Sequence, residues 1–159
     1  MYTFSPADRS HLPAVFALID RRTRWMQARG IHQWDTYREA YPDDYFRAVT
    51  EKGQLWLLRQ DDRIAAMVTL WDTDSQWTDD APALYLHNLA ADEAFPGAGR
   101  AILEHCADRA ETLHRDRLRL DCSAENPRLN AYYEAQGFAF VTALPGSAYY
   151  RPNLRQRML

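Results

Sequence analysis

Residues 84–103 read LYLHNLAADEAFPGAGRAIL, the most informative sequence of this chain for its architecture. The apolar run at 84–91 predicts a buried strand, and the Pro and Gly residues after it open a helix that we expect to end near His114. Gly97 and Gly99 keep side chains away from the first helical turn, so a ligand can approach the unpaired backbone N–H groups there. Those donors and the positive end of the helix dipole favour an anion such as a phosphate. The stretch therefore predicts a strand, a phosphate-binding turn and a helix.

A second motif follows at residues 126–138, NPRLNAYYEAQGF. Asn126 and Pro127 are typical of an N-cap and a first helical residue, and Gly137 is typical of a left-handed residue after the last turn. Taken alone, the two adjacent tyrosines of this helix are more typical of core packing than of catalysis. The motif predicts a helix over about 127–136.

The remaining elements are predicted from hydrophobic periodicity and from Gly and Pro positions. They are a strand at 2–4, a helix from Leu12 to Arg29, a helix from Pro42 to Gly53, strands at 54–59 and 63–71, a loop at 72–83, and strands at 117–122, 138–142 and 147–151. The hairpin in the first half indicates antiparallel strands, and the helix–strand alternation in the second half indicates parallel ones. We therefore expect an α/β (α+β) fold with a mixed sheet flanked by helices.

The length of 159 residues suits one domain, residues 1–159, and the composition of 47% hydrophobic and 26% charged residues is that of a globular protein. No apolar run is long enough to span a membrane, and MYTFSPADRS does not resemble a signal peptide, so we expect a cytoplasmic protein. The formal charge of −3 gives no attraction to nucleic acid or to an anionic membrane. Cys106 and Cys122 form no CxxC pair, and we expect them to be buried.

Together the two motifs resemble the GNAT acetyltransferase superfamily. The family's phosphate turn, Q/R-x-x-G-x-G/A, is matched by residues 94–99, and its later pattern, N-x-x-A-x-x-L/Y-Y-E-x-x-G-F, by residues 126–138. Ala94 and Leu129 depart from these patterns. The resemblance implies a single-domain GNAT fold with a mixed sheet of about six or seven strands, about four helices, and a V-shaped splay between the fourth and fifth strands.

The resemblance further implies that acetyl-coenzyme A is the acetyl donor. Its diphosphate would bind the glycine turn, and its pantetheine arm would pair with the preceding strand. The residues implied to bind it are Leu89, Ala90, Ala91, Phe95, Pro96, Gly97, Ala98, Gly99, Arg100, Ala101, Asn126 and Tyr133.

Catalysis requires a proton donor for the departing thiolate and a base for the attacking amine. Tyr133 matches the tyrosine that serves as the acid in this family. His87 is the candidate base, although a lone histidine on a strand is more often structural, and Glu125 or water are alternatives. The histidines do not share ligand spacing with carboxylates or cysteines, so we expect no metal site.

The acceptor is expected to be a primary amine of a small molecule. Acetylation of a protein N-terminus, a lysine or an aminoacyl group, and a non-catalytic coenzyme A-binding module, are the alternatives. Aromatic and acidic side chains of the first half would suit a cationic amine. They are Trp25, Trp34, Trp71, Asp72 and Trp77, with Asp74, Asp79 and Asp80. The sequence leaves open whether the chain forms a homodimer through a sheet edge or its tail.

Overall fold

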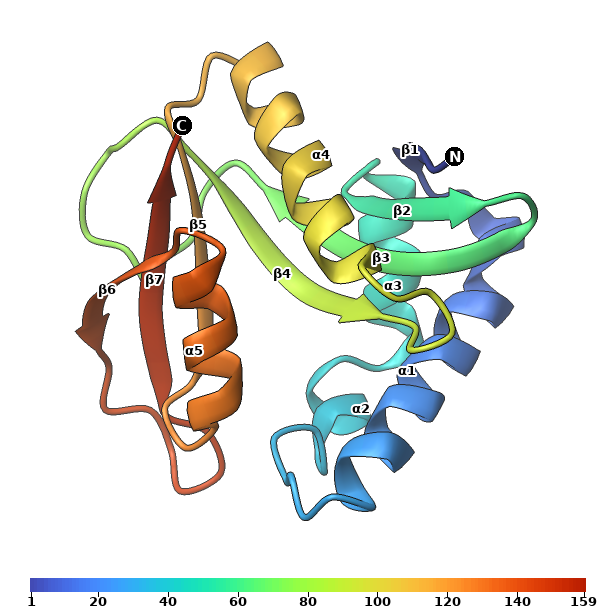
Figure 1. The fold of residues 1–159 in the computed structure, drawn as a ribbon, viewed down its shortest axis with the longest axis horizontal. Helices are drawn as coiled ribbons and strands as arrows, with labels where there is room; N and C mark the ends of the chain where they lie inside the picture. The colour runs from blue at the N-terminus through green and yellow to red at the C-terminus, as the bar shows by residue number, and fades with distance from the viewer. The chain divides into compact units, whose positions relative to one another are not determined.

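The computed structural model describes all residues from Met1 to Leu159. Its elements are β1 (Thr3–Pro6), the short 3₁₀ helix η1 (Arg9–His11), α1 (Leu12–Gln27), α2 (Tyr37–Ala40), α3 (Asp43–Glu51), β2 (Leu55–Gln60), β3 (Arg63–Trp71), β4 (Ala83–Ala91), α4 (Ala98–Thr112), β5 (Arg117–Ser123), α5 (Pro127–Ala135), β6 (Ala139–Ala143) and β7 (Pro152–Met158) (Figure 1). The strands belong to one seven-stranded sheet in the order β1-β2-β3-β4-β5-β7-β6. The predicted mixed α/β architecture is confirmed.

The chain divides into two compact units. The first unit comprises Met1–Leu70 and Asn88–Leu103, and the second comprises Trp71–His87 and Glu104–Leu159. The residues of β4 and of α4 are each divided between the two units. The organisation as a single domain stays a prediction.

The first unit is built on a meander of β1, β2 and β3, which pair antiparallel. The turn between β2 and β3 places Asp61 in the left-handed region, with φ at 53°, a conformation that Asp tolerates better than most residues. Helix α3 contacts both α1 and β2. Leu18 of α1, Phe46 of α3 and Leu57 of β2 are fully buried in the core that results. This packing holds the end of β4 and the start of α4, which carry the predicted phosphate turn.

The second unit contains the start of β4, paired parallel with β5, and the antiparallel strands β7 and β6. The ladder between β4 and β5 joins Ala83–Tyr85 to Arg117–Arg119 and ends there, although β5 runs on to Ser123. On its other edge, β5 pairs with β7 along its whole length, from Arg117 to Ser123. Helix α5 contacts β5 and β6. The parallel pairing of β4 with β5 thus ends at Tyr85.

The tail differs from the prediction. Residues 147–151 form a turn in which the Ser147 N–H donates to the Tyr150 carbonyl, and the last strand is Pro152–Met158. This strand was missed because Asn, Gln and Arg are not typical strand residues. Arg155, only 6% exposed, is accommodated because its guanidinium donates to the Asn130 side chain and to the Phe138 carbonyl.

Both cysteines are buried and unpaired, as predicted. Cys122 donates to the Asn130 side chain at 3.3 Å. Burial raises the pKa of both thiols, that of Cys122 to about 11. The two thiols therefore remain protonated at neutral pH.

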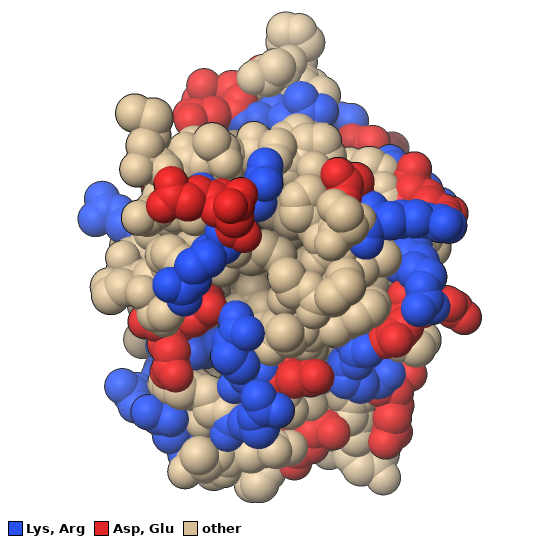
Figure 2. Space-filling model, turned by 90° about the vertical axis from the view of Figure 1, so that its right-hand side faces the viewer, with Lys and Arg blue, Asp and Glu red and all other residues tan.

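The surface carries basic and acidic side chains intermixed. Figure 2 shows both signs side by side across the visible face, without a large patch of one sign. None of the helices combines the length and the apolar character needed to cross a bilayer.

Candidate active site

The predicted phosphate turn lies in the first unit, between the end of β4 and the start of α4. Gly97 has φ at 86°, a conformation that a side chain would strain, and an added Cβ there would meet no atom within 4 Å. The Ala98 N–H donates to the Phe95 carbonyl and the Ala101 N–H to the Gly97 carbonyl. The structure assigns no protein acceptor to the N–H groups of Gly97 and Gly99. The turn is thus open and carries free donors at the start of a 15-residue helix.

Asp92 organises the approach to this turn. Its buried carboxylate accepts the Ala94 N–H at 2.9 Å and an Arg21 guanidinium N–H at 2.7 Å, and its own N–H donates to the Ala65 carbonyl. Through this ion pair the half-exposed Arg21 ties α1 to the loop that precedes the phosphate turn.

Asn88 distorts β4 directly before the predicted pantetheine strand. It has φ at 55°, an uncommon conformation for a residue other than Gly and one that interrupts the pleat. Its side chain accepts the Tyr45 hydroxyl at 2.7 Å and donates to the Tyr37 hydroxyl at 2.8 Å. These bonds attach the distorted part of β4 to α2, through Tyr37, and to α3, through Tyr45, within the first unit. Strained backbone of this kind gathers at functional sites.

His87, the predicted base, lies in the second unit on β4. Its Nε2 is 2.8 Å from Asp74 Oδ2, and its ring centroid is 3.9 Å from that of Trp71. The side chains of His87 and Asp74 are only 9% and 6% exposed. This contact joins the buried imidazole to the Asp74 carboxylate. Burial raises the pKa of Asp74, but the His87 ring and the Gln76 N–H outweigh this effect, and the pKa is lowered overall.

Asp121 of β5 completes a cluster with these two residues. The ligand-type atoms of Asp74, His87 and Asp121 all lie within 4.8 Å of one another. Asp121 accepts the Gln76 side-chain N–H at 3.1 Å and the Tyr150 hydroxyl at 2.6 Å. A histidine and two carboxylates are therefore gathered in the second unit, beside the point where the β4–β5 ladder ends. The sequence analysis expected no such grouping, because the three residues are far apart in the chain.

Tyr133, the predicted acid, projects from α5 in the second unit. Asn126 caps this helix by accepting the Leu129 N–H at 3.1 Å, and Gly137 ends it with φ at 88°, both as predicted. Tyr133 is 6% exposed, and its ring packs edge-on against Phe138. Its hydroxyl forms no hydrogen bond with the protein. Burial raises the pKa of Tyr133 far above its ordinary value, so the hydroxyl carries a proton at neutral pH.

Glu125, an alternative base in the sequence analysis, lies on the surface. Its side chain is 68% exposed and accepts from the guanidinium of Arg151 at 2.8 Å. Glu125 is therefore engaged in a surface ion pair, whereas the His87 side chain is buried.

The predicted acceptor residues are spread over both units. In the first unit, Trp25 lies between the guanidinium groups of Arg22 and Arg29, at 4.2 and 4.0 Å, and Trp34 stacks on Tyr37 at 4.1 Å.

In the second unit, Asp72 is 72% exposed and accepts from Arg115, and Trp77 lies under the guanidinium of Arg119 at 4.0 Å. Trp71, beside His87, is the one predicted tryptophan that borders the His–Asp cluster.

Arg119 holds the loop between β3 and β4 against β5. It is 2% exposed and donates to both carboxylate oxygens of Asp79, at 2.6 and 2.9 Å, and to Gln156. Asp79 was predicted to face the acceptor, but in the structure it neutralises this buried guanidinium. These bonds from Arg119 lower the pKa of Asp79 from 3.8 to about 2.

We expect Asp79→Asn to lower the thermal midpoint, because the variant leaves a buried guanidinium without its anionic partner. A lowered folded-state pKa stabilises the fold above the unfolded pKa, and this contribution is lost as the pH falls through the folded value. The difference in thermal midpoint between wild type and variant should thus be constant above about pH 5. It should shrink between pH 4 and the folded pKa of about 2. A pH-independent difference would contradict this account.

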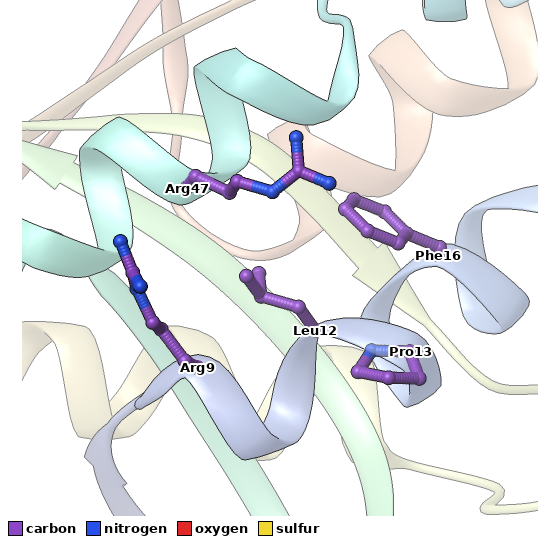
Figure 3. Close-up of a pocket in the computed structure, with 5 residues that line it drawn as sticks. All are labelled: Arg9, Leu12, Pro13, Phe16 and Arg47. Atoms are coloured by element: carbon purple, nitrogen blue, oxygen red, sulfur yellow. The ribbon is translucent and has the colours of Figure 1, made fainter.

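A surface pocket of about 300 Å³ in the first unit lies away from all predicted site residues. Arg9, Leu12, Pro13, Phe16 and Arg47 line it (Figure 3). Both arginines are already paired, Arg9 with Glu51 and Arg47 with Asp44. The pocket offers no reactive group and is not a candidate active site.

Comparison with known proteins agrees with the two motifs. The chain matches the Acetyltransferase (GNAT) family over residues 17–138. It is 28% identical over 147 residues to the uncharacterized N-acetyltransferase YesJ of Bacillus subtilis (strain 168), an alignment that covers 87% of this chain and 82% of YesJ.

Solved structures share the fold. A GNAT-family acetyltransferase of Listeria monocytogenes aligns with a TM-score of 0.80 at 22% identity, covering 99% of this chain and 95% of its own. The PaiA N-acetyltransferase of Thermoplasma acidophilum was solved in complex with coenzyme A and aligns with a TM-score of 0.75 at 13% identity. The alignment covers 100% of this chain and 99% of the PaiA chain. Since the family match spans most of the chain and contains both motifs, this protein belongs to the GNAT family of acetyl-coenzyme A-dependent N-acetyltransferases.

Proposed function

We propose that this enzyme transfers the acetyl group of acetyl-coenzyme A to a primary amine of a small molecule. The observation that carries the proposal is Tyr133, a buried tyrosine whose hydroxyl has no protein partner and stays protonated at neutral pH. A residue that served packing alone would need no such hydroxyl, and a free proton donor suits a departing thiolate.

For the coenzyme, the open turn at Gly97–Gly99 supports a diphosphate site. Its free N–H groups and the start of α4 would stabilise negative charge, and Arg100 would add a cation. The residues at 89–91 would pair with the amides of the pantetheine arm. Asn126 would contact the same arm, although its side-chain oxygen already caps α5.

In the proposed reaction, His87 accepts a proton from the acceptor, and the neutral amine attacks the thioester carbonyl. The C–N bond forms first and gives a tetrahedral oxyanion, which a backbone N–H of β4 would stabilise. The C–S bond then breaks, the Tyr133 hydroxyl protonates the thiolate, and the remaining proton of the nitrogen passes through solvent to the tyrosinate. His87 is supported over other bases by its burial beside Asp74, a carboxylate that stabilises the imidazolium it would become.

The coenzyme site can be tested at Gly97. We expect Gly97→Val to weaken acetyl-coenzyme A binding at least tenfold, about 1.4 kcal/mol, because a side chain would stand between the N–H groups and the diphosphate. Isothermal titration with acetyl-coenzyme A measures the effect.

Gly53→Val is the matched control, since Gly53 also has positive φ, at 67°, and open space around its Cβ position. Both variants should lose similar stability, but only Gly97→Val should lose affinity. Equal affinities of the two folded variants for acetyl-coenzyme A would refute the proposed phosphate site.

Screening of amines for thiol release in the presence of acetyl-coenzyme A tests the activity itself. A small-molecule acceptor predicts turnover with free amines, whereas a protein acceptor predicts turnover only with peptides. Tight acetyl-coenzyme A binding without turnover of any amine or peptide would identify a non-catalytic binding module.

A further inference from the structure

Asp92 holds the loop that leads from β4 into the predicted phosphate turn. Its N–H donates to the Ala65 carbonyl of β3 at 2.8 Å, and its carbonyl accepts the Phe95 N–H at 3.0 Å. Its carboxylate accepts the Ala94 N–H at 2.9 Å. The position of Gly97, which follows in the same loop, therefore depends on how Asp92 is held.

The negative charge of Asp92 is paired with a cation from another element of the first unit. The Asp92 side chain is 8% exposed, and its Oδ2 accepts an N–H of Arg21, on α1, at 2.7 Å. A carboxylate withdrawn from water is costly unless a cation and hydrogen bonds compensate it. Because the carboxylate of this pair is buried, solvent and salt screen the pair less than an ordinary surface ion pair.

Arg22, the next residue of α1, is engaged elsewhere. Its guanidinium lies over the Trp25 ring, 4.2 Å from the ring centroid. Burial lowers the pKa of Arg22, whereas the charges of Asp92 and Glu93 act in the opposite direction. The acidic start of the loop thus faces α1, and Arg21 is the residue of that helix that donates to it.

The Asp92 carboxylate is an unfavourable neighbour for the ligand proposed at the turn. A diphosphate is an anion, and it would bind the N–H groups of Gly97 and Gly99, a few residues beyond Asp92. An uncompensated negative charge close to that site would repel it. The same carboxylate is nevertheless needed to accept the Ala94 N–H. A cation paired with the carboxylate removes the repulsion and keeps the hydrogen bond.

We propose that Arg21 and Asp92 are positioning residues of the coenzyme site: Arg21 neutralises Asp92, so that the Asp92 carboxylate holds the phosphate turn without repelling the diphosphate. The inference rests on the diphosphate site proposed above, and both residues act through the turn. Helix α1 also carries Trp25, a predicted acceptor residue. One helix would therefore contribute to the binding of both substrates.

Isothermal titration of the full chain with coenzyme A tests the inference and needs no acceptor. In Arg21→Gln, the Kd for coenzyme A should rise about fivefold or more, because the buried carboxylate loses its cation. Arg21→Lys keeps the positive charge, and its Kd should stay within about threefold of wild type. The decisive variant is the double mutant Arg21→Gln/Asp92→Asn, in which an amide oxygen can still accept the Ala94 N–H. It should bind coenzyme A more tightly than Arg21→Gln alone.

Salt distinguishes a charge effect from a loss of structure. The difference in Kd between wild type and Arg21→Gln should shrink as NaCl is raised from about 20 mM to about 500 mM, since ions screen the repulsion. Arg24→Gln is the matched control, because Arg24 lies on the same helix, is exposed and carries the same charge. Its Kd for coenzyme A should stay within about twofold of wild type at both salt concentrations.

Three results would overturn the inference and leave the acetyltransferase function intact. They are an unchanged Kd or a salt-independent loss in Arg21→Gln, a double mutant that binds no more tightly than Arg21→Gln, and a loss in Arg24→Gln as large as that in Arg21→Gln. An unchanged affinity in Gly97→Val would instead refute the diphosphate site on which the inference rests. A wild-type chain that does not bind coenzyme A would refute the proposed function.

Discussion

Replacing Tyr133 with Phe is expected to lower kcat by roughly 10²- to 10⁴-fold, the range that general acid catalysis typically contributes. The change removes one oxygen from a ring that is 6% exposed and packed against Phe138, so the fold should be retained. A proton donor to the leaving thiolate acts chiefly in the transition state. Affinity for acetyl-coenzyme A should accordingly change less than about threefold. Paired steady-state kinetics and cofactor titration separate the two effects.

Tyr132→Phe is the control for this variant. The two tyrosines are adjacent on α5, and successive helical residues point about 100° apart. Tyr132 is 36% exposed, whereas Tyr133 faces the interior. Full kcat in Tyr133→Phe, or a larger loss in Tyr132→Phe, would show that Tyr133 is not the acid.

Replacing Asn88 with Ala is expected to destabilise the chain by roughly 2 to 3 kcal/mol. Two hydroxyl bonds, to Tyr37 and Tyr45, would be lost at about 1 kcal/mol or more each. Asn adopts the left-handed conformation more readily than Ala, and this difference adds up to about 1 kcal/mol. Urea unfolding followed by tryptophan fluorescence gives the difference in unfolding free energy.

Asn88→Gly separates the two contributions, because glycine adopts positive φ without steric strain. This variant should lose the hydroxyl bonds but recover about 1 kcal/mol or more relative to Asn88→Ala. Equal stability of the Gly and Ala variants would mean that the conformation of Asn88 is not strained.

The elements that could be predicted from sequence are those marked by local chemistry. The ends of α5 are marked in the sequence. In the structure, as predicted, Asn126 is the N-cap, Pro127 lies in the first turn and Gly137 has a left-handed conformation. Gly97 likewise marks a turn that only a residue tolerant of positive φ adopts without strain. Such signals act within a few residues, so a single sequence contains them.

The parts that could not be predicted depend on partners distant in the chain. The left-handed Asn88 is set by hydroxyls from α2 and α3, and nothing near residue 88 signals it. Asp79 was expected to face the acceptor because its loop is acidic, yet it belongs to Arg119, which lies 40 residues further on. One signal was available for Asp121, since it alternates with apolar residues on the same strand face as Arg117 and Arg119, and a charged residue in a central strand needs a partner.

The burial of the two cysteines has a practical consequence for detecting the reaction product. Reagents such as aromatic disulfides react with thiolates, and their colour reports thiol concentration directly. Cys106 and Cys122 are both inaccessible and protonated, so the folded enzyme should contribute almost no background colour. Free coenzyme A released during turnover can then be followed continuously in the same cuvette. Slow colour development in the absence of an amine would report opening of the fold itself.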